Sequence, residues 1–192
     1  MFETKETLVT TETTSRPQIE AGTWTLDKAH TKIGFVAKHL MVSKVRGHFA
    51  RYDAEIVVGD ELTDSTIEVE IDPNSITTGA DDRDNHLRST DFFGVETHPE
   101  MTFVSTDISR DGDVWRVTGD LTIRDVTRPV TLDATYEGTA TDPWGNQHVG
   151  FSAQATINRE DWDLTWNAPL EGGGWLVSKE IILEIEGQLV RP

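Results

Sequence analysis

The sequence predicts an all-β fold of antiparallel strands, and three observations lead to that prediction. Along much of the 192 residues, apolar and polar side chains alternate strictly, which is typical of strands with one buried face. The alternating segments are separated by Gly, Asp, Asn and Pro, the residues that favour tight turns. No apolar run approaches the roughly 18 residues that a membrane-spanning helix needs. A single barrel or sandwich of this length is therefore expected.

The clearest alternation lies in segment 66–72, where Ile67, Val69 and Ile71 are separated by polar residues. The same period of two predicts further strands at 115–124, 130–136, 149–157 and 181–185. Less regular strands are expected at 23–26, 31–38, 45–57 and 101–108, which brings the total to about eight or nine. Turns are expected at Gly59-Asp60, at Asp111-Gly112, from Asp125 to Pro129 and from Asp142 to Asn146.

One segment departs from the alternation and predicts a short helix over residues 80–89. The run Thr78-Gly79-Ala80-Asp81 fits a capping box, and Asp81 and Asp82 suit the positive end of a helix dipole. A second long connection, 159–175, carries three tryptophans and a glycine triplet, which we interpret as a glycine-rich bend.

Small side chains on the apolar strand faces raise the question of what fills the interior. Gly119, Ala134, Ala153 and Ala155 stand where a solid core would place larger residues, which favours a cavity. The alternative is that Trp162, Trp166 or Trp175 folds in and fills the space, and the residues alone do not decide between the two.

Composition limits the classes of partner. The chain has 34 acidic and 17 basic residues, a net charge of −17, and no cysteine. Such a surface repels phosphate backbones and anionic headgroups, so we expect no nucleic-acid partner and no stable membrane insertion. Without cysteine there are no disulfides and no thiolate sites. A homodimer through an exposed strand is conceivable.

The first twenty residues are polar and rich in Thr and Glu, and they lack the apolar centre of a secretory signal. We therefore expect a flexible extension over residues 1–20, a single domain over 21–192 and a cytoplasmic location.

No known catalytic motif is present, and we predict no catalytic residue, no cofactor and no metal site. The richest polar cluster is on the predicted helix. There Asp82 and His86 lie one turn apart, with His98 following, which makes a metal site conceivable. A capped, solvated helix end is the favoured explanation of the acids, because zinc sites usually need three or four convergent ligands. Paired carboxylates for acid–base chemistry are a weaker alternative for the same reason.

The sequence resembles the YceI-like, polyisoprenoid-binding proteins from about Gly22 to Val190. The resemblance rests on GTWTLDKAHTKIGFVAKHLMVSKVRGHF, on VTGDLTIRDVTRPVTL and on GFSAQATINREDW, and most specifically on RDNHLRSTDFF together with HPEMTF. It implies an extended antiparallel lipocalin-like β-barrel of about eight strands with one short helix near residues 80–89. The segment LTWNAPLEGGGWLVSK could reshape or plug the interior, so the identity of a ligand does not carry over.

What the resemblance implies about function is a long apolar tunnel for an isoprenoid or fatty-acyl chain. Arg83, His86 and Arg88, with Phe92 and Phe93, would lie near a mouth where a polar head group could rest. The predicted ligand-binding residues are Phe35, Phe49, Ile67, Val69, Ile71, Arg83, His86, Phe92, Phe93, Phe103, Leu121, Leu132, Ala134, Phe151, Ala153, Trp166 and Leu183.

Three functions are weighed against one another. The first is non-enzymatic binding, transport or storage of a long-chain lipid such as a polyisoprenoid. The second is an enzyme at the barrel mouth with His86 as the base and Asp82 or Asp84 orienting it. The third is a ligand-free, stress-associated structural domain with a solid core.

Overall fold

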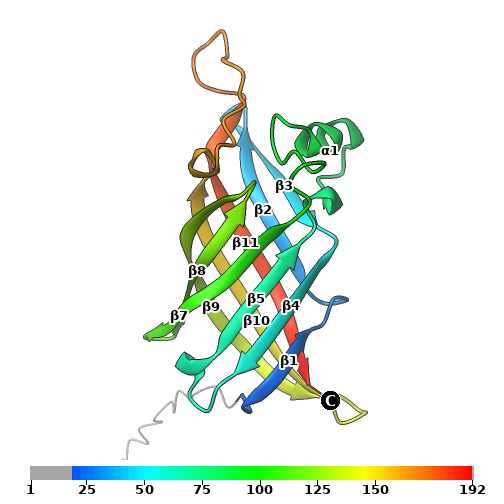
Figure 1. Cartoon of the computed structure of the whole chain (residues 1–192), viewed down its shortest axis with the longest axis vertical. Coiled ribbons are helices and arrows are strands. Elements are labelled where there is room, and N and C mark those ends of the chain that lie inside the picture. Colours follow the sequence, from blue (N-terminus) through cyan, green and yellow to red (C-terminus); the bar gives the residue numbers. More distant parts are fainter. Residues whose placement is uncertain (1–18, 192) are drawn as a thin grey trace, which may run out of the picture.

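The computed structural model of the chain describes residues 19–191. Eleven strands form one antiparallel sheet over these residues, with one α-helix and three short 3₁₀ segments (Figure 1). The strands are β1 (Gly22–Leu26), β2 (Lys32–His39), β3 (Ser43–Phe49), β4 (Tyr52–Val58), β5 (Thr66–Ile71), β6 (Ile76–Thr77), β7 (Met101–Asp111), β8 (Val114–Ile123), β9 (Val126–Thr141), β10 (Gln147–Asn158) and β11 (Val177–Arg191). The helix α1 is Asp81–Arg88, and the 3₁₀ segments are η1 (Leu62–Asp64), η2 (Pro73–Ser75) and η3 (Arg159–Trp162).

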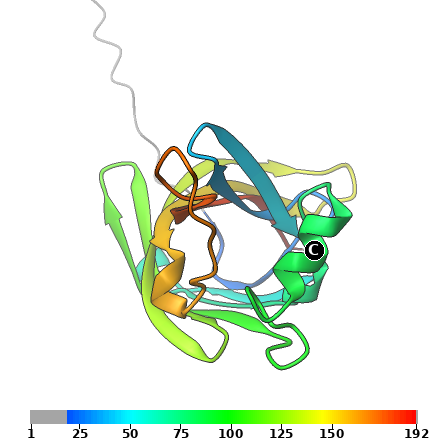
Figure 2. The same cartoon turned by 90° about the horizontal axis from the view of Figure 1, so that it is seen from above.

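The sheet closes into a ring of eight strands. Its order runs β1, β4, β5, β7, β8, β9, β10 and β11, and β11 pairs with β1 again through Thr25 opposite Val190. Closure gives every strand of this ring a partner on both sides over part of its length, which is how barrels limit edge-to-edge association. The prediction of a closed antiparallel barrel of about eight strands with one short helix is confirmed (Figure 2).

Three further strands extend the barrel at one end. The upper part of β11 pairs with β2, β2 pairs with β3, and β3 pairs with the short β6. Residues 45–57, expected as one strand, are therefore two strands, because the chain bends at Ala50 and Arg51 to pass from this extension into the ring. The two-residue β6 carries no alternation of its own and is missed by the sequence pattern.

One predicted turn is displaced. The bend between β8 and β9 is at Arg124 and Asp125, which both have left-handed backbone angles, φ 51° and 64°. Pro129, expected to end that turn, lies inside β9 opposite Asp120. Proline is tolerated there because this part of β9 has a partner only on the β8 side among the described residues.

The helix is where the sequence predicts it, but its start is built differently. The N-cap is Ala80, which has no side chain that can accept a hydrogen bond. Thr78 instead donates from its backbone N and from its hydroxyl to the carboxylate of Asp84, a residue that is 4% exposed. The predicted capping box is therefore wrong, and a buried side-chain bond one turn into α1 ties the helix to the preceding segment.

Inward glycines in the sheet accommodate phenylalanine rings from neighbouring strands. A Cβ on Gly47 would lie 2.4 Å from the ring of Phe35, and a Cβ on Gly119 would lie 2.4 Å from the ring of Phe103. Gly119 is therefore small because a ring covers it, and it does not border empty space as the sequence interpretation assumed. This pairing of glycine with a cross-strand aromatic is a recognised way to complete a curved sheet.

Candidate ligand-binding cavity

An apolar cavity of about 270 Å³ lies inside the ring. Ten of the predicted ligand-binding residues border it: Ile67, Val69, Ile71, Phe103, Leu121, Leu132, Ala134, Phe151, Ala153 and Leu183. The volume exceeds the roughly 150 Å³ of a dry cavity that holds benzene and is close to the lower limit of about 300 Å³ for small-molecule pockets. Ala134 and Ala153 face each other across β9 and β10, as the small-residue argument predicts.

The cavity wall carries no charged side chain. Its polar side chains are Ser65, Thr135 and Tyr136. The hydroxyl of Ser65 accepts a hydrogen bond from Gly59 N, and the Tyr136 hydroxyl is hydrogen-bonded to Thr139. These two hydroxyls therefore already have partners, and the wall is suited to an apolar chain and poorly suited to a charged group.

The sequence interpretation missed 17 of the 27 residues of the wall. Many of the missed residues continue alternating faces that it had recognised, so extending each face to the ends of its strand would have found them. The missed residues are Ile19, Leu26, Ile33, Gly34, Ile56, Val58, Leu62, Ser65, Ile108, Trp115, Val117, Val130, Thr135, Tyr136, Val149, Ile185 and Leu189.

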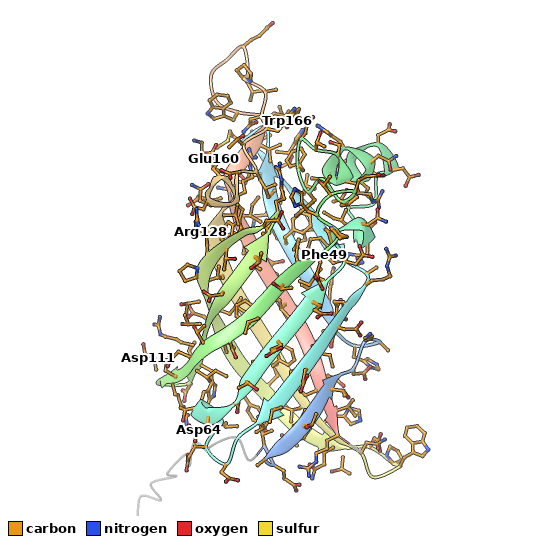
Figure 3. The ribbon with its side chains drawn as sticks, viewed as in Figure 1. Phe49, Asp64, Asp111, Arg128, Glu160 and Trp166 are labelled. Carbon is orange, nitrogen blue, oxygen red and sulfur yellow. The ribbon has the colours of Figure 1, made fainter. Side chains whose placement is uncertain are left out.

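Near α1 the barrel is filled by aromatic side chains. The ring centroid of Phe49 lies 6.0 Å from that of Phe35 and 5.8 Å from that of Phe93, with the second pair edge to face. Phe49 is labelled in the upper part of the barrel in Figure 3. These three predicted ligand-binding residues do not border the cavity. We call them the aromatic plug.

The predicted polar residues of α1 make contacts within the protein. Arg83 donates from Nε to the Thr78 hydroxyl (2.6 Å) and from Nη2 to the Thr78 carbonyl (2.9 Å). Arg88 donates to the carbonyl oxygens of Asn74 and Ile76. Together with Asp84, these arginines hold α1 on the end of the barrel.

His86 lies in a second aromatic cluster at the same end. Its ring centroid is 4.5 Å from that of Trp166 and 5.1 Å from that of Phe92, both edge to face. Its Nε2 is 2.9 Å from a carboxylate oxygen of Asp91. The enzyme hypothesis required Asp82 or Asp84 to orient His86. The carboxylate that contacts His86 is that of Asp91 instead. His86, Phe92 and Trp166 do not border the cavity.

Of the three tryptophans in the connection after β10, Trp162 is buried in the interior, but it does not fill the cavity. Trp162 is 2% exposed, and its indole nitrogen donates to the carbonyl of Leu121. Arg159, in the same 3₁₀ segment, is 3% exposed and donates to the carbonyl oxygens of Ser178 and Leu164. Burial lowers the pKa of Arg159, and Glu160 acts in the opposite direction.

Beside Trp162 the barrel wall is split. β9 and β10 pair only up to Asp133 opposite Gln154, so the segments 126–132 and 155–158 run unpaired with each other. A hollow of about 510 Å³ occupies the split, and Val130 borders both this hollow and the cavity. Trp162 closes the split from within.

Residues 19–191 hold no group of three or more His, Asp or Glu side chains placed to bind one metal ion. Across the same residues, no helix has the length and apolar character needed to span a bilayer.

Comparison with known proteins agrees with this architecture. Residues 24–189 match the model of the YceI-like domain. The chain belongs to the YceI-like family. A UPF0312 protein of Staphylococcus epidermidis is 41% identical over 165 residues, which cover 84% of this chain and 94% of that protein. A UPF0312 protein of Pectobacterium atrosepticum is 40% identical over 160 residues, covering 82% and 81%.

Solved structures of three similar proteins have the same fold. The Campylobacter jejuni YceI protein is 35% identical and superposes with a TM-score of 0.69, over 87% of this chain and 96% of that chain. BcnA of Burkholderia cenocepacia, 24% identical, gives a TM-score of 0.71 over 87% and 99%. A polyisoprenoid-binding domain from Saccharophagus degradans, 16% identical, gives 0.62 over 90% and 100%.

Proposed function

We propose that this YceI-like protein binds one long apolar chain, of the polyisoprenoid or fatty-acyl type, inside the barrel and carries or stores it without catalysis. The observation that carries the proposal is the 270 Å³ cavity with an uncharged, almost wholly aliphatic and aromatic wall. The structural similarity to the polyisoprenoid-binding domain from Saccharophagus degradans supports the same class of ligand.

The energetics of such binding rest on transfer of methylene groups out of water. Each buried methylene contributes about 0.8 kcal/mol, from which the cost of ordering the chain is subtracted. Because the wall offers no charge, discrimination between ligands comes from length and branching. A charged head group would have to remain outside the cavity.

The first experiment is native mass spectrometry of protein purified without detergent, followed by lipid extraction. We expect one apolar adduct of defined mass per protein. If the purified protein is empty, added isoprenoid alcohols should be taken up at a ratio of one to one. An empty protein that also fails to take up isoprenoids and fatty acids would contradict the proposal and favour a ligand-free domain.

A pair of variants on adjacent residues of β10 tests the location. Ala153→Phe places a ring in the cavity, because Ala153 borders it, and should abolish uptake. Gln154→Phe adds a ring at the next residue, which is exposed on the outer face, and should leave uptake unchanged. Equal uptake by both variants would place the ligand elsewhere.

A further inference from the structure

Exposed apolar side chains gather at one end of the barrel. Among residues 19–191, seven large apolar side chains are exposed, and four of them lie on two adjoining loops. These four, which we call the apolar tip, are Leu40 (41% exposed), Met41 (54%), Val42 (85%) and Trp175 (47%). Leu40 N donates to the carbonyl of Leu176, and Gly174 lies against Met41, so the two loops are in contact.

Two residues of the apolar tip have backbone angles that their residue types disfavour. Leu40 and Met41 form the turn between β2 and β3, and both have left-handed backbone angles, φ 53° and 61°. Turns of this kind favour Asn and Gly, and a leucine or methionine there is strained. Strain that persists at an exposed site indicates a use for the side chains that carry it.

The hairpin that carries the tip is basic, whereas the protein as a whole is acidic. Residues 32–49 include four Lys and Arg residues and no acid, in a protein of net charge −17, and of these four Arg46 lies 3.8 Å from Glu184 of β11. Lys38 and Lys44 stand directly opposite each other at the base of the hairpin. Like charges in that arrangement destabilise a strand pair. Among the described residues, neither lysine lies within 4.0 Å of a carboxylate oxygen.

We propose that the β2–β3 hairpin, together with the loop carrying Trp175, docks this protein transiently on the surface of a bilayer that contains anionic phospholipids. The apolar tip would enter the headgroup region, and Lys38 and Lys44 would contact the phosphates. An apolar insertion combined with a small basic patch is the two-part signal that gives reversible attachment.

The arrangement of the remaining charges sets the orientation. The helix α1, whose first turn carries the acids Asp81 and Asp82, lies across the end of the barrel from the turn between β2 and β3, as Figure 2 shows. These acids disfavour a flat approach of that end and leave the hairpin side as the first point of contact. Glu171, in the loop beside the tip, opposes docking on an anionic surface. The net charge of −17 keeps the attachment reversible.

Flotation with vesicles tests the proposal and does not require cargo in the barrel. We expect the protein to float with vesicles of equal parts phosphatidylcholine and phosphatidylglycerol, and to float poorly with phosphatidylcholine alone. Failure to float would overturn docking without affecting lipid uptake, since uptake is measured separately by mass spectrometry.

The decisive variant is Leu40→Asn combined with Met41→Gly, which gives the turn its favoured residues. It should fold at least as stably as the original chain, yet bind vesicles at least roughly 10-fold more weakly, because each large apolar side chain kept in water forfeits about that factor. Trp144→Ser is the control, since Trp144 is 84% exposed on the β9–β10 hairpin at the opposite end. Equal loss in both variants would overturn the proposal.

The charge component is tested separately. Lys38→Gln with Lys44→Gln should weaken binding to the anionic vesicles roughly 30-fold, at about 1 kcal/mol for each lysine. Lys28→Gln with Arg128→Gln removes the same charge away from the tip and should have little effect. Glu171→Gln should strengthen binding. If the protein instead self-associates in solution through the tip and ignores vesicles, the partner of this surface is a second copy and docking is wrong.

Discussion

In the lower part of the barrel, aliphatic and aromatic side chains surround a cavity of about 270 Å³, whereas near α1 the ring of Phe49 packs against the rings of Phe35 and Phe93. Both regions belong to one continuous sheet and follow the same alternation. The difference arises because extra elements lie over one end only. There α1, β6 and η3 bring side chains inward from outside the ring, and Trp162 is among them. A barrel of eight strands is therefore hollow or filled according to what its connections contribute.

The largest expected effect is the loss of Trp162 from the filled end. Trp162→Ala removes a side chain that is 2% exposed and its hydrogen bond to Leu121. It should therefore lower the free energy of unfolding by about 3–5 kcal/mol. Urea denaturation followed by circular dichroism measures it. Trp144→Ala, at an exposed position, should change stability by less than about 0.5 kcal/mol. Similar values for the two variants would contradict a packed upper end.

Adding one methyl group at two inward glycines sharpens the comparison. Gly47→Ala pushes on Phe35, which is held by Phe49, and should cost about 1–3 kcal/mol. Gly187→Ala pushes on Thr31 and Phe151, and should cost under about 1 kcal/mol because the Phe151 ring borders the cavity and can move. Denaturation midpoints in the same buffer compare them. The reverse ranking would show that the cavity end is the tighter of the two.

Partly filling the cavity should be tolerated. Ala153→Leu adds apolar atoms to empty space and should stabilise the ligand-free protein by about 0.5–2 kcal/mol. Thermal unfolding of delipidated protein measures this change. Destabilisation of the ligand-free protein would mean that the lower barrel has no room for a side chain and hence none for a ligand.

The smallest expected effect concerns the rim of the hollow end, on the β9–β10 turn. Burial raises the pKa of Asp142, but hydrogen bonds from Asn146, His148 and Trp144 N outweigh it and lower the pKa from 3.8 to about 2. Because the folded pKa is the lower one, the carboxylate stabilises the fold above about pH 4, and this contribution is lost as the pH falls toward 2.

Asp142→Asn should therefore reduce the acid dependence of stability in that window. Urea midpoints measured at neutral pH and through the acid range test it. The control is Asp113→Asn on the β7–β8 hairpin, which should retain the acid dependence of the original chain. An unchanged profile for Asp142→Asn would mean that these hydrogen bonds do not form in solution.

Prediction from the sequence succeeded where the signal is local. Ile67, Val69 and Ile71 face inward as their alternation requires, and α1 lies within the predicted segment 80–89. It failed where a neighbour far along the chain decides. Gly119 was interpreted as bordering empty space, but Phe103 covers it.

Of the expected extension over residues 1–20, only Ile19 and Glu20 lie within the described residues, and Trp24 donates to the carbonyl of Glu20.

The predicted binding residues divide along the same line. Those on regular strands, such as Leu132 and Leu183, border the cavity because strand alternation fixes which way they point. Those carried by the motif around α1, such as Arg83 and His86, contact Thr78 and Asp91 and lie outside it. The motif is thus explained by the attachment of α1, and any contact with a head group there is a prediction that ligand binding has to test.

The sequence by itself determined most of the strands, the short helix and the family, since each depends on residue patterns within a few positions of one another. The tertiary structure decided that β1 meets β11 to close the ring, that Phe35, Phe49 and Phe93 fill one end, and that Lys38 and Lys44 stand together on a basic hairpin of an acidic protein. These features depend on which residues meet across the fold. Thr25 and Val190, the pair that closes the ring, are 165 residues apart, and no local pattern records such a contact.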